Sequence, residues 1–248
     1  MTTNSAPPPP PTTTSVLVTG ATRGLGLEAA HRFAALGWTV WLGARDAERG
    51  DKAAADVAAA QPDADVRPLL LDVTDDASVA AAYDVLVASG TGLDVLVNNA
   101  GIAGTHAAPA EVVPADFLPV FGVNLLGPVR VTHAFLPLLR RSAAPRLVMV
   151  SSGMGSFAIT GDPDRVESTV PGLVYPASKA ALNMVTTMYA KALPDVRVVA
   201  VDPGYTATDL NGHSGPQSVA EGVEAIVTGA AADTLPGPFV GRDGALGW

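Results

Sequence analysis

The fold is set by the stretch "SVLVTGATRGLG", residues 15–26, in which an apolar run of the strand type leads directly into a glycine-rich loop. The glycines at positions 20, 24 and 26 allow a tight turn and a close approach of the backbone to a ligand. A helix expected behind the loop, over 24–36, would offer unpaired backbone N–H groups to a pyrophosphate. Glycine in such turns can also serve packing alone, but its place between a first strand and a first helix predicts a dinucleotide-binding fold.

The alternation of strand and helix continues along the chain. Seven strands are expected, at 15–19, 39–44, 66–71, 94–98, 146–151, 196–201 and, more weakly, 238–240. Helices are expected near 24–36, 46–60, 76–89, 115–141, 176–192 and 217–229. Strands that are apolar throughout are typical of a parallel sheet covered on both faces. The pattern predicts a single-domain, Rossmann-type α/β fold, with a doubly wound, mostly parallel seven-stranded sheet, helices on both faces and ligands beyond the carboxyl ends of the strands.

Composition narrows the class of protein. The chain has 248 residues, of which 48% are hydrophobic, enough for one sizeable core. Its net charge of −9 argues against nucleic acid and anionic membranes as partners, and no apolar stretch has the length of a membrane span. The chain has no cysteine, and its four histidines lack metal-ligand spacing, so no metal site is expected. The absence of disulfides fits a reducing compartment, and a cytoplasmic location is expected.

The N-terminal residues form a separate segment. The stretch "MTTNSAPPPPPTTT", residues 1–14, has neither the basic start nor the apolar run of a secretory signal. Its five consecutive prolines favour an extended or disordered segment. We expect a flexible Pro/Thr-rich tail at 1–14 and one dinucleotide-binding catalytic domain at 15–248.

Two arginines favour a phosphorylated dinucleotide. The second strand ends at Ala44 and Arg45, where a carboxylate would select NAD but an arginine suits the 2′-phosphate of NADP. Arg23 lies inside the glycine-rich loop, and guanidinium groups pair with phosphate through two parallel hydrogen bonds. The neighbouring Asp46 is an acid that would instead bind the ribose of NAD, so NAD stays an alternative. The expected cofactor is NADP(H).

Several further motifs, in order, resemble those of the short-chain dehydrogenase/reductase family over almost the whole chain after the tail. The loop "TGATRGLG" matches the family's TGxxxGxG, and further matches are "LDV" (71–73), "NNAG" (98–101), "VNLLGP" (123–128), "VSSGMGS" (150–156), "YPASK" (175–179) and "DPGYTATDL" (202–210). Arg23, Arg45 and a long gap before the tyrosine are similar to the family's carbonyl reductases that use NADPH.

The resemblance implies contacts to the cofactor from every motif. Asp72 and Val73 would contact the adenine, and the segment after the sixth strand would hold the nicotinamide amide, although Thr206 stands where the family more often has Val or Ile. The implied cofactor-binding residues are Gly20, Thr22, Arg23, Gly24, Leu25, Gly26, Arg45, Asp72, Val73, Asn99, Ala100, Gly101, Tyr175, Lys179, Pro203, Gly204, Thr206 and Thr208.

The resemblance also implies four catalytic residues: Asn124, Ser152, Tyr175 and Lys179. Tyr175 and Lys179 are four positions apart and so share one helix face, where the ammonium is expected to lower the pKa of the phenol from its usual value of about 10. Tyr175 would then protonate a carbonyl that receives a hydride. Ser152 would hold that carbonyl, with Ser151 as the alternative. Asn124 would hold a water linking the lysine to solvent, unless it marks only a local helix kink.

Residues beside these motifs are the expected walls of an apolar substrate pocket: Ile102, Met154, Phe157, Tyr205 and Leu210. Ser152 and Tyr175 lie 23 positions apart, more than is usual in the family. The charged, proline-containing stretch at 156–174 therefore predicts a surface insertion. It sits beside the helix that many family members use for dimer contact, which favours a monomer or dimer over a tetramer.

These observations predict an NADP-dependent oxidoreductase of the carbonyl reductase (ketoreductase) type, which transfers a hydride reversibly between NADPH and a small ketone or aldehyde. One alternative is a 3-oxoacyl-thioester reductase of fatty-acid or polyketide metabolism, which the acidic surface disfavours because the acyl carrier is acidic too. The other is a non-catalytic NADPH-sensing protein, which the loss of a catalytic residue would favour. No catalytic residue is lost.

Overall fold

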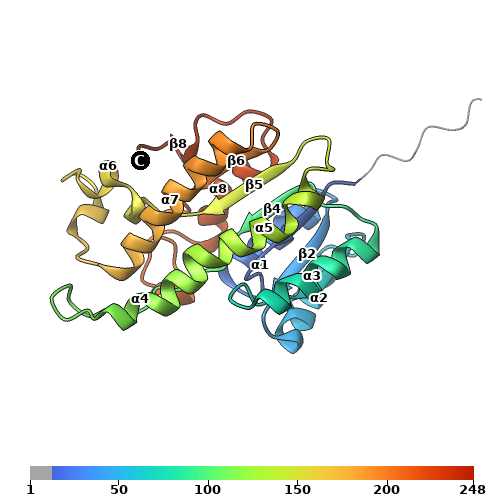
Figure 1. Cartoon of the computed structure of the whole chain (residues 1–248), viewed down its shortest axis with the longest axis horizontal. Coiled ribbons are helices and arrows are strands. Elements are labelled where there is room, and N and C mark those ends of the chain that lie inside the picture. The colour runs from blue at the N-terminus through green and yellow to red at the C-terminus, as the bar shows by residue number, and fades with distance from the viewer. Residues whose placement is uncertain (1–12) are drawn as a thin grey trace, which may run out of the picture.

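The computed structural model describes residues 13–248 as one α/β domain with helices on both sides of a single sheet (Figure 1). All but the last two residues of the predicted tail at 1–14 lie outside the described residues. The sheet has eight strands in the order β3-β2-β1-β4-β5-β6-β7-β8. They are β1 Ser15–Val18, β2 Thr39–Ala44, β3 Val66–Leu70, β4 Val95–Asn98, β5 Arg146–Val150, β6 Arg197–Val201, β7 Phe239–Gly241 and β8 Gly244–Ala245.

The doubly wound, mostly parallel sheet expected from the sequence is confirmed, with one strand more than the seven predicted. Strands β1 to β7 pair in parallel, and the additional β8 pairs antiparallel with β7. β8 has only two residues, one of them Gly244, so no apolar strand pattern announces it. The strand order runs outward in both directions from β1 and β4, which opens a crevice at their carboxyl ends.

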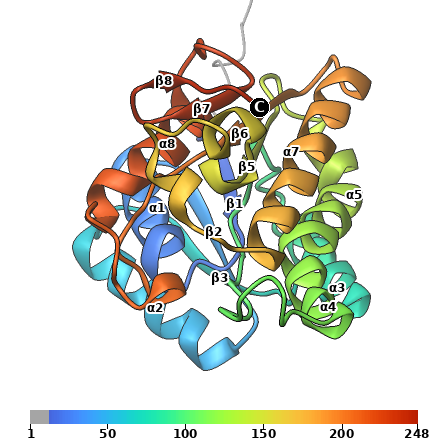
Figure 2. The ribbon, with the colours of Figure 1, turned by 90° about the vertical axis from the view of Figure 1, so that its left-hand side faces the viewer.

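Alternating side chains of the strands bury both faces of the sheet. In β1, Val16 and Val18 join an apolar cluster with α1 and α8, whereas Leu17 joins the cluster on the opposite face with α3, α5 and α7. Figure 2 shows the two helical layers on either side of the sheet. The helices are α1 Gly24–Ala35, α2 Ala47–Ala60, α3 Asp76–Ser89, α4 Pro114–Phe121, α5 Gly127–Leu139, α6 Phe157–Thr160, α7 Val174–Ala192 and α8 Val219–Ala231.

The single helix predicted over 115–141 is two helices joined by a π-helical turn. The turn, Gly122–Leu126, lies between α4 and α5 and carries the fully buried Asn124. The sequence prediction missed it because the backbone stays helical from α4 through the turn into α5, so no loop residue marks the change. Turns of this kind often mark functional sites.

The stretch at 156–174, predicted as a surface insertion, is exposed over most of its length, at 157–158, 161–166 and 168–173. Ser156 and Ile159 are buried. The Ser156 hydroxyl donates to the carbonyl oxygen of Gly247 at 2.7 Å, which fixes this segment against the C-terminal residues. The segment thus lies at the surface as predicted, and Ser156, Ile159 and Val174 are its buried residues.

β3 forms one edge of the sheet. The N–H groups of a strand point alternately to its two sides, and the N–H of Leu71 points toward β2, since it donates to Ala44 O at 2.7 Å. Pro68, three positions earlier, therefore faces the free edge with no N–H to present.

The turn that follows β5 packs tightly on α7. A Cβ atom added at Gly155 would lie 2.5 Å from the carbonyl carbon of Lys179 and 2.7 Å from the nitrogen of Ala180. Both are backbone atoms, which cannot rotate away. Glycine at this position therefore sets the distance between the serine loop and the helix that carries Tyr175.

We expect Gly155→Ala to lower the free energy of unfolding by about 1–3 kcal/mol, since the added methyl group must displace α7. Chemical denaturation measures the change. Gly122→Ala is the matched control, because no atom lies within 4 Å of its added Cβ and its φ of −55° suits alanine. Equal stability of the two variants would contradict the tight packing of the turn.

Candidate active site

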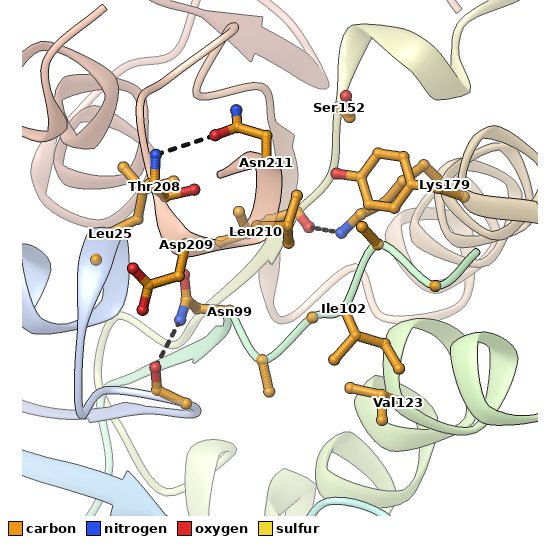
Figure 3. A pocket seen from close by; sticks show the side chains of 18 of the residues that line it. Leu25, Asn99, Ile102, Val123, Ser152, Lys179, Thr208, Asp209, Leu210 and Asn211 are labelled. Atoms are coloured by element: carbon orange, nitrogen blue, oxygen red, sulfur yellow. Dashed lines mark hydrogen bonds between the residues drawn. The ribbon is translucent and has the colours of Figure 1, made fainter. Parts of the chain in front are cut away.

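A cleft of about 940 Å³ lies at the carboxyl ends of the strands. Figure 3 shows it from close by, with Leu25 and Thr208 on one side and Ser152 and Lys179 on the other. All but two of the site residues predicted from the sequence line it. The two exceptions are Asn124, which is buried beneath it, and Phe157.

Phe157 was predicted as a pocket wall, and this prediction was wrong. It begins α6, its side chain is 84% exposed, and it does not line the cleft. Proximity in sequence to Ser152 was a poor guide, because a short 3-10 turn at Gly153–Gly155 separates the two. The insertion instead contributes Val166, Val170 and Leu173 to the cleft, which no motif in the sequence indicated.

The glycine-rich loop is built for close backbone contacts. Gly20 has a φ of +64°, and a Cβ there would lie 2.9 Å from Ala100 Cα. A Cβ at Gly26 would lie 2.5 Å from Asn99 Nδ2. The Thr19 hydroxyl oxygen accepts hydrogen bonds from the N–H groups of Asn99 (2.9 Å) and Ala100 (3.0 Å). The ends of β1 and β4 are therefore locked together beside the loop.

The start of α1 fits a dinucleotide pyrophosphate. Its N-cap residue, Arg23, makes no side-chain capping hydrogen bond, so the N–H groups of the first turn stay available at the cleft. The start of α2 differs, because Asp46 Oδ1 accepts a hydrogen bond from Arg49 N at 2.9 Å. Asp46 is the acid that would bind the ribose of NAD, and one of its carboxylate oxygens is used for this cap.

Three arginines line the cofactor end of the cleft: Arg23, Arg45 and Arg49. Arg49 was missed, although its place in the first turn of the helix that follows Arg45 was a usable signal. Arg23 Nη1 lies 2.7 Å from Asp209 Oδ2, and both side chains are largely exposed. An exposed pair of this kind contributes about 1 kcal/mol or less, so a phosphate can displace the carboxylate.

Tyr175 and Lys179 meet Ser152 at the other end of the cleft. Tyr175 lies in the first turn of α7, and Lys179 Nζ is 5.6 Å from the centroid of its ring. The ammonium donates a hydrogen bond to Val150 O at 2.7 Å. Ser152 lies close enough to the phenol of Tyr175 to lower its pKa, whereas the Ser151 hydroxyl is buried and bonds Asn183. The geometry thus favours Ser152 over Ser151 as the partner of the tyrosine.

The expected lowering of the Tyr175 pKa is wrong for this structure. Burial raises the pKa of Tyr175 to about 12, and the nearby Ser152 hydroxyl offsets only part of that effect. Burial also lowers the pKa of Lys179 to about 8. The spacing of the two residues indicates the attraction between phenolate and ammonium, but it does not show the loss of solvation that both groups suffer on burial.

Asn124 connects the floor of the cleft to α7. Its Oδ1 accepts from Ile102 N at 2.9 Å, and its Nδ2 donates to Ile102 O at 2.9 Å and to Ser178 Oγ at 3.0 Å. Ser178 in turn donates to Tyr175 O at 2.7 Å. Asn124 lies in the π-helical turn, so the expected local irregularity of the helix is present. Its side chain also supports the turn that carries Tyr175. Its role in a water relay stays a prediction.

The described part of the chain, residues 13–248, contains no cluster of three or more His, Cys, Asp or Glu side chains that could hold a metal ion. Within the same residues, no helix has both the length and the apolar character needed to cross a bilayer.

Known proteins resemble this chain over most of its length. A family model described as short chain dehydrogenase matches residues 14–218. The chain is 33% identical to (−)-isopiperitenone reductase of Mentha piperita, covering 93% of this chain and 96% of that protein. It is 32% identical to (+)-neomenthol dehydrogenase of Arabidopsis thaliana, covering 85% and 89%. The structure is similar to NADPH-bound carbonyl reductase from chicken fatty liver, with a TM-score of 0.82 and 28% identity over 95% of this chain and 99% of that one.

The lowered pKa of Lys179 predicts a pH-dependent stability. A pKa of about 8 in place of 10.5 means that the buried charge costs on the order of 3 kcal/mol below pH 8. Lys179→Met removes this cost together with one hydrogen bond, so we expect it to raise the free energy of unfolding by about 1–3 kcal/mol at pH 7.

Between pH 8 and 10 the folded wild type loses this proton while the unfolded chain keeps it, so wild-type stability rises and the advantage of the variant shrinks. Urea denaturation at pH 7 and pH 10 measures both values. Lys191→Met changes an exposed lysine of the same helix and should leave stability nearly unchanged. A Lys179→Met variant that is no more stable than the wild type at pH 7 would refute the buried charge.

Proposed function

The chain belongs to the short-chain dehydrogenase family of oxidoreductases, and from this premise we propose that it is an NADPH-dependent carbonyl reductase that converts small ketones or aldehydes to alcohols. One observation carries the proposal: the phenol of Tyr175 lies beside both Ser152 and Lys179, in the same cleft as the glycine-rich loop. A proton donor and a hydroxyl anchor thus stand together at one end of a dinucleotide-sized cleft.

The roles of the side chains follow from their chemistry. A bound nicotinamide would supply the hydride. The Ser152 hydroxyl donates a hydrogen bond to the substrate oxygen and holds the carbonyl against Tyr175. As negative charge develops on that oxygen, Tyr175 transfers its proton to it. A pKa of about 12 keeps this phenol protonated throughout the neutral range, which is the form that reduction requires.

Lys179 and Asn124 support the donor. The ammonium of Lys179 stabilises the phenolate that remains after the proton has moved, since the opposite charges lie close together in a site with little water. Asn124 holds the backbone of Ile102 and, through Ser178, the turn of α7 that carries Tyr175. The proposed water relay from Lys179 to solvent would pass near this side chain.

The arginines support NADPH over NADH. Arg45 and Arg49 both line the cleft at the end of β2, where a 2′-phosphate would lie in a fold of this kind. The structurally similar carbonyl reductase from chicken fatty liver has NADPH bound, which favours the same cofactor for this chain. Asp46 also lines the cleft, but one of its carboxylate oxygens caps α2.

The pocket favours an uncharged, apolar carbonyl compound. The side chains that line it include Ile102, Val123, Met154 and Leu210, together with Leu173 from the insertion. Such walls exclude water from the reacting oxygen and offer no cationic group for the phosphate of an acyl carrier. We therefore prefer a free ketone or aldehyde to a carrier-bound thioester.

Tyr175→Phe should lower kcat for NADPH-dependent ketone reduction by about 10²–10⁴-fold, because the proton donor is lost. The loss of NADPH absorbance with a panel of ketones, aldehydes and quinones measures turnover. NADPH fluorescence should show that binding is retained. Tyr189→Phe, in the same helix but outside the cleft, should keep full activity. Unchanged turnover in Tyr175→Phe would remove the acid assignment, and a wild type that binds NADPH without turnover would favour the sensor.

Arg45→Ala should weaken NADPH binding by about 10–100-fold and leave NADH binding nearly unchanged, since a charge-assisted contact contributes roughly 1.5–3 kcal/mol. Fluorescence titration with both dinucleotides measures the two affinities. Arg141→Ala removes an exposed arginine beyond the end of α5 and should alter neither affinity. Equal affinity of the wild type for NADH and NADPH would refute the arginine assignment.

A further inference from the structure

A buried carboxylate stands beside the proposed proton donor and has no part in the reaction as derived above. Asp202 follows the last residue of β6, its side chain borders the cleft, and it is only 6% exposed. Its charge acts on both Tyr175 and Lys179. A carboxylate buried to this extent requires hydrogen bonds or cations to balance it.

The carboxylate of Asp202 connects two loops that are distant in sequence. It accepts a hydrogen bond from Gly204 N at 2.9 Å and another from the backbone N–H of Gly153. Gly153 immediately follows Ser152, the proposed carbonyl anchor. Gly204 lies in the segment expected to hold the nicotinamide amide. One side chain thus joins the loop for the substrate to the loop for the cofactor.

The close approach depends on glycine at position 153. A Cβ atom there would lie 2.9 Å from Asp202 Oδ2 and 3.1 Å from Glu167 Oε1. Any side chain at 153 would force the carboxylates away from the backbone. Two acidic groups therefore converge on the residue next to Ser152, and the insertion supplies one of them.

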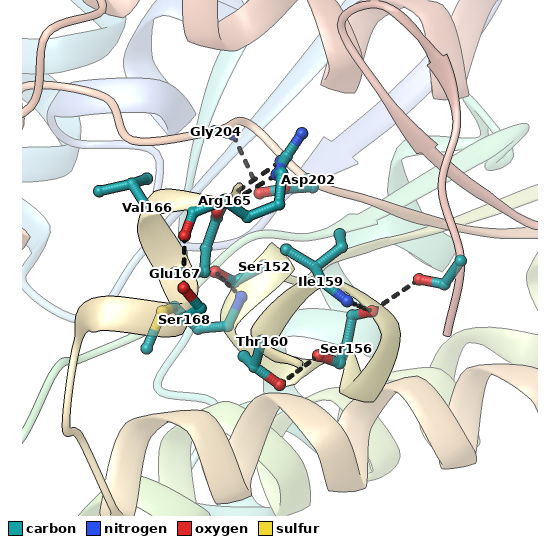
Figure 4. A network of polar contacts seen from close by, with 12 residues as sticks. Ser152, Ser156, Ile159, Thr160, Arg165, Val166, Glu167, Ser168, Asp202 and Gly204 are labelled. Carbon is teal, nitrogen blue, oxygen red and sulfur yellow. Dashed lines mark hydrogen bonds and ion pairs between the residues drawn. The ribbon is translucent and has the colours of Figure 1, made fainter. Parts of the chain in front are cut away.

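The insertion also supplies the balancing cation. Arg165 Nη2 lies 3.3 Å from Glu167 Oε1, and the guanidinium attracts Asp202 as well. Glu167 borders the cleft, with its side chain only 12% exposed. Figure 4 shows Arg165 and Glu167 beside Asp202, Gly204 and Ser152. The inserted segment is thereby coupled to the centre of the cleft.

We propose that Asp202 is a positioning residue, which ties the Ser152 loop to the loop at Gly204 and whose charge is balanced by Arg165 of the inserted segment, itself paired with Glu167. This inference rests on the proposed function, because its catalytic consequence is the alignment of the carbonyl anchor with the cofactor. A displacement of about 1 Å between reacting groups can reduce a rate by about a hundredfold, so a tie between these loops bears directly on turnover.

The charge state of Asp202 bears on this tie. The groups that face it are Arg165 and Glu167 of the insertion and Tyr175 and Lys179 of α7. Burial raises the pKa of Asp202, with the charge of Glu167 acting in the same direction, while the two amide hydrogen bonds and Arg165 oppose the rise. Protonation removes one acceptor from the carboxylate, so the tie weakens as the solution becomes acidic.

The test compares Asp202→Asn with the wild type in the full chain. The amide side chain keeps the shape but offers one acceptor oxygen in place of two. We expect kcat to fall by about 10–100-fold and the affinity for NADPH, measured by fluorescence, to change less than threefold. The kcat of the wild type should also fall at acidic pH as Asp202 becomes protonated, and Asp202→Asn should lack this fall because the amide does not titrate. Amide hydrogen exchange in the absence of cofactor should become faster in peptides over 151–156 and 203–206.

Two further variants make the outcome decisive. Asp195→Asn alters an exposed aspartate that pairs with Arg140 and should change neither kcat nor exchange in these peptides. Arg165→Gln, on the insertion, should change both in the same direction as Asp202→Asn but less, and it carries the test if Asp202→Asn does not fold. Unchanged exchange in both loops, or a kcat within twofold of the wild type, would overturn the proposal. If the wild type reduces no carbonyl compound, the proposed function is refuted. Amide hydrogen exchange in the two loops still tests whether Asp202 ties them together, because it does not depend on activity.

Discussion

Val16, Leu17 and Val18 of β1 pair in parallel register with Val95, Leu96 and Val97 of β4. This pairing brings two loops that are about 80 residues apart to one edge of the sheet, where Thr19 fixes them through hydrogen bonds to Asn99 and Ala100. The crevice exists because the chain leaves β1 and β4 in opposite directions across the sheet. The glycine-rich loop, the serine loop and the start of α7 take their places relative to this junction.

Much of this arrangement is predictable because it depends on local chemistry. Apolar runs that end in glycine predict strands followed by close turns, and the carboxyl ends of parallel strands must meet at one edge. Residues as distant as Gly20, Ser152 and Thr208 are therefore assignable to one cleft from the order of their motifs along the chain. The π-helical turn at Asn124 and the two-residue β8 have no comparable signal, because the turn lies within continuous helical backbone and β8 is too short to form an apolar run.

The errors concern what surrounds a residue rather than what it is. Phe157 follows the serine motif closely, yet a turn of three residues carries it to the surface. The insertion is mostly exposed, as its charge and prolines indicate, but the sequence does not show that Arg165 pairs with Glu167 and balances the buried charge of Asp202. The pKa of Tyr175 was expected to move in the other direction, since a sequence shows which groups are neighbours but not how much solvent they lose.

The proline at the edge of the sheet has a consequence for behaviour at high concentration. An open edge strand offers a row of donors and acceptors that the edge of another molecule can join. In β3, Pro68 interrupts that row on the outward side, and the neighbouring Arg67 carries a charge paired with Asp65. A second sheet that approached this edge would find a missing donor and a bulky ring, so the strand resists edge-to-edge aggregation without help from any other part of the chain.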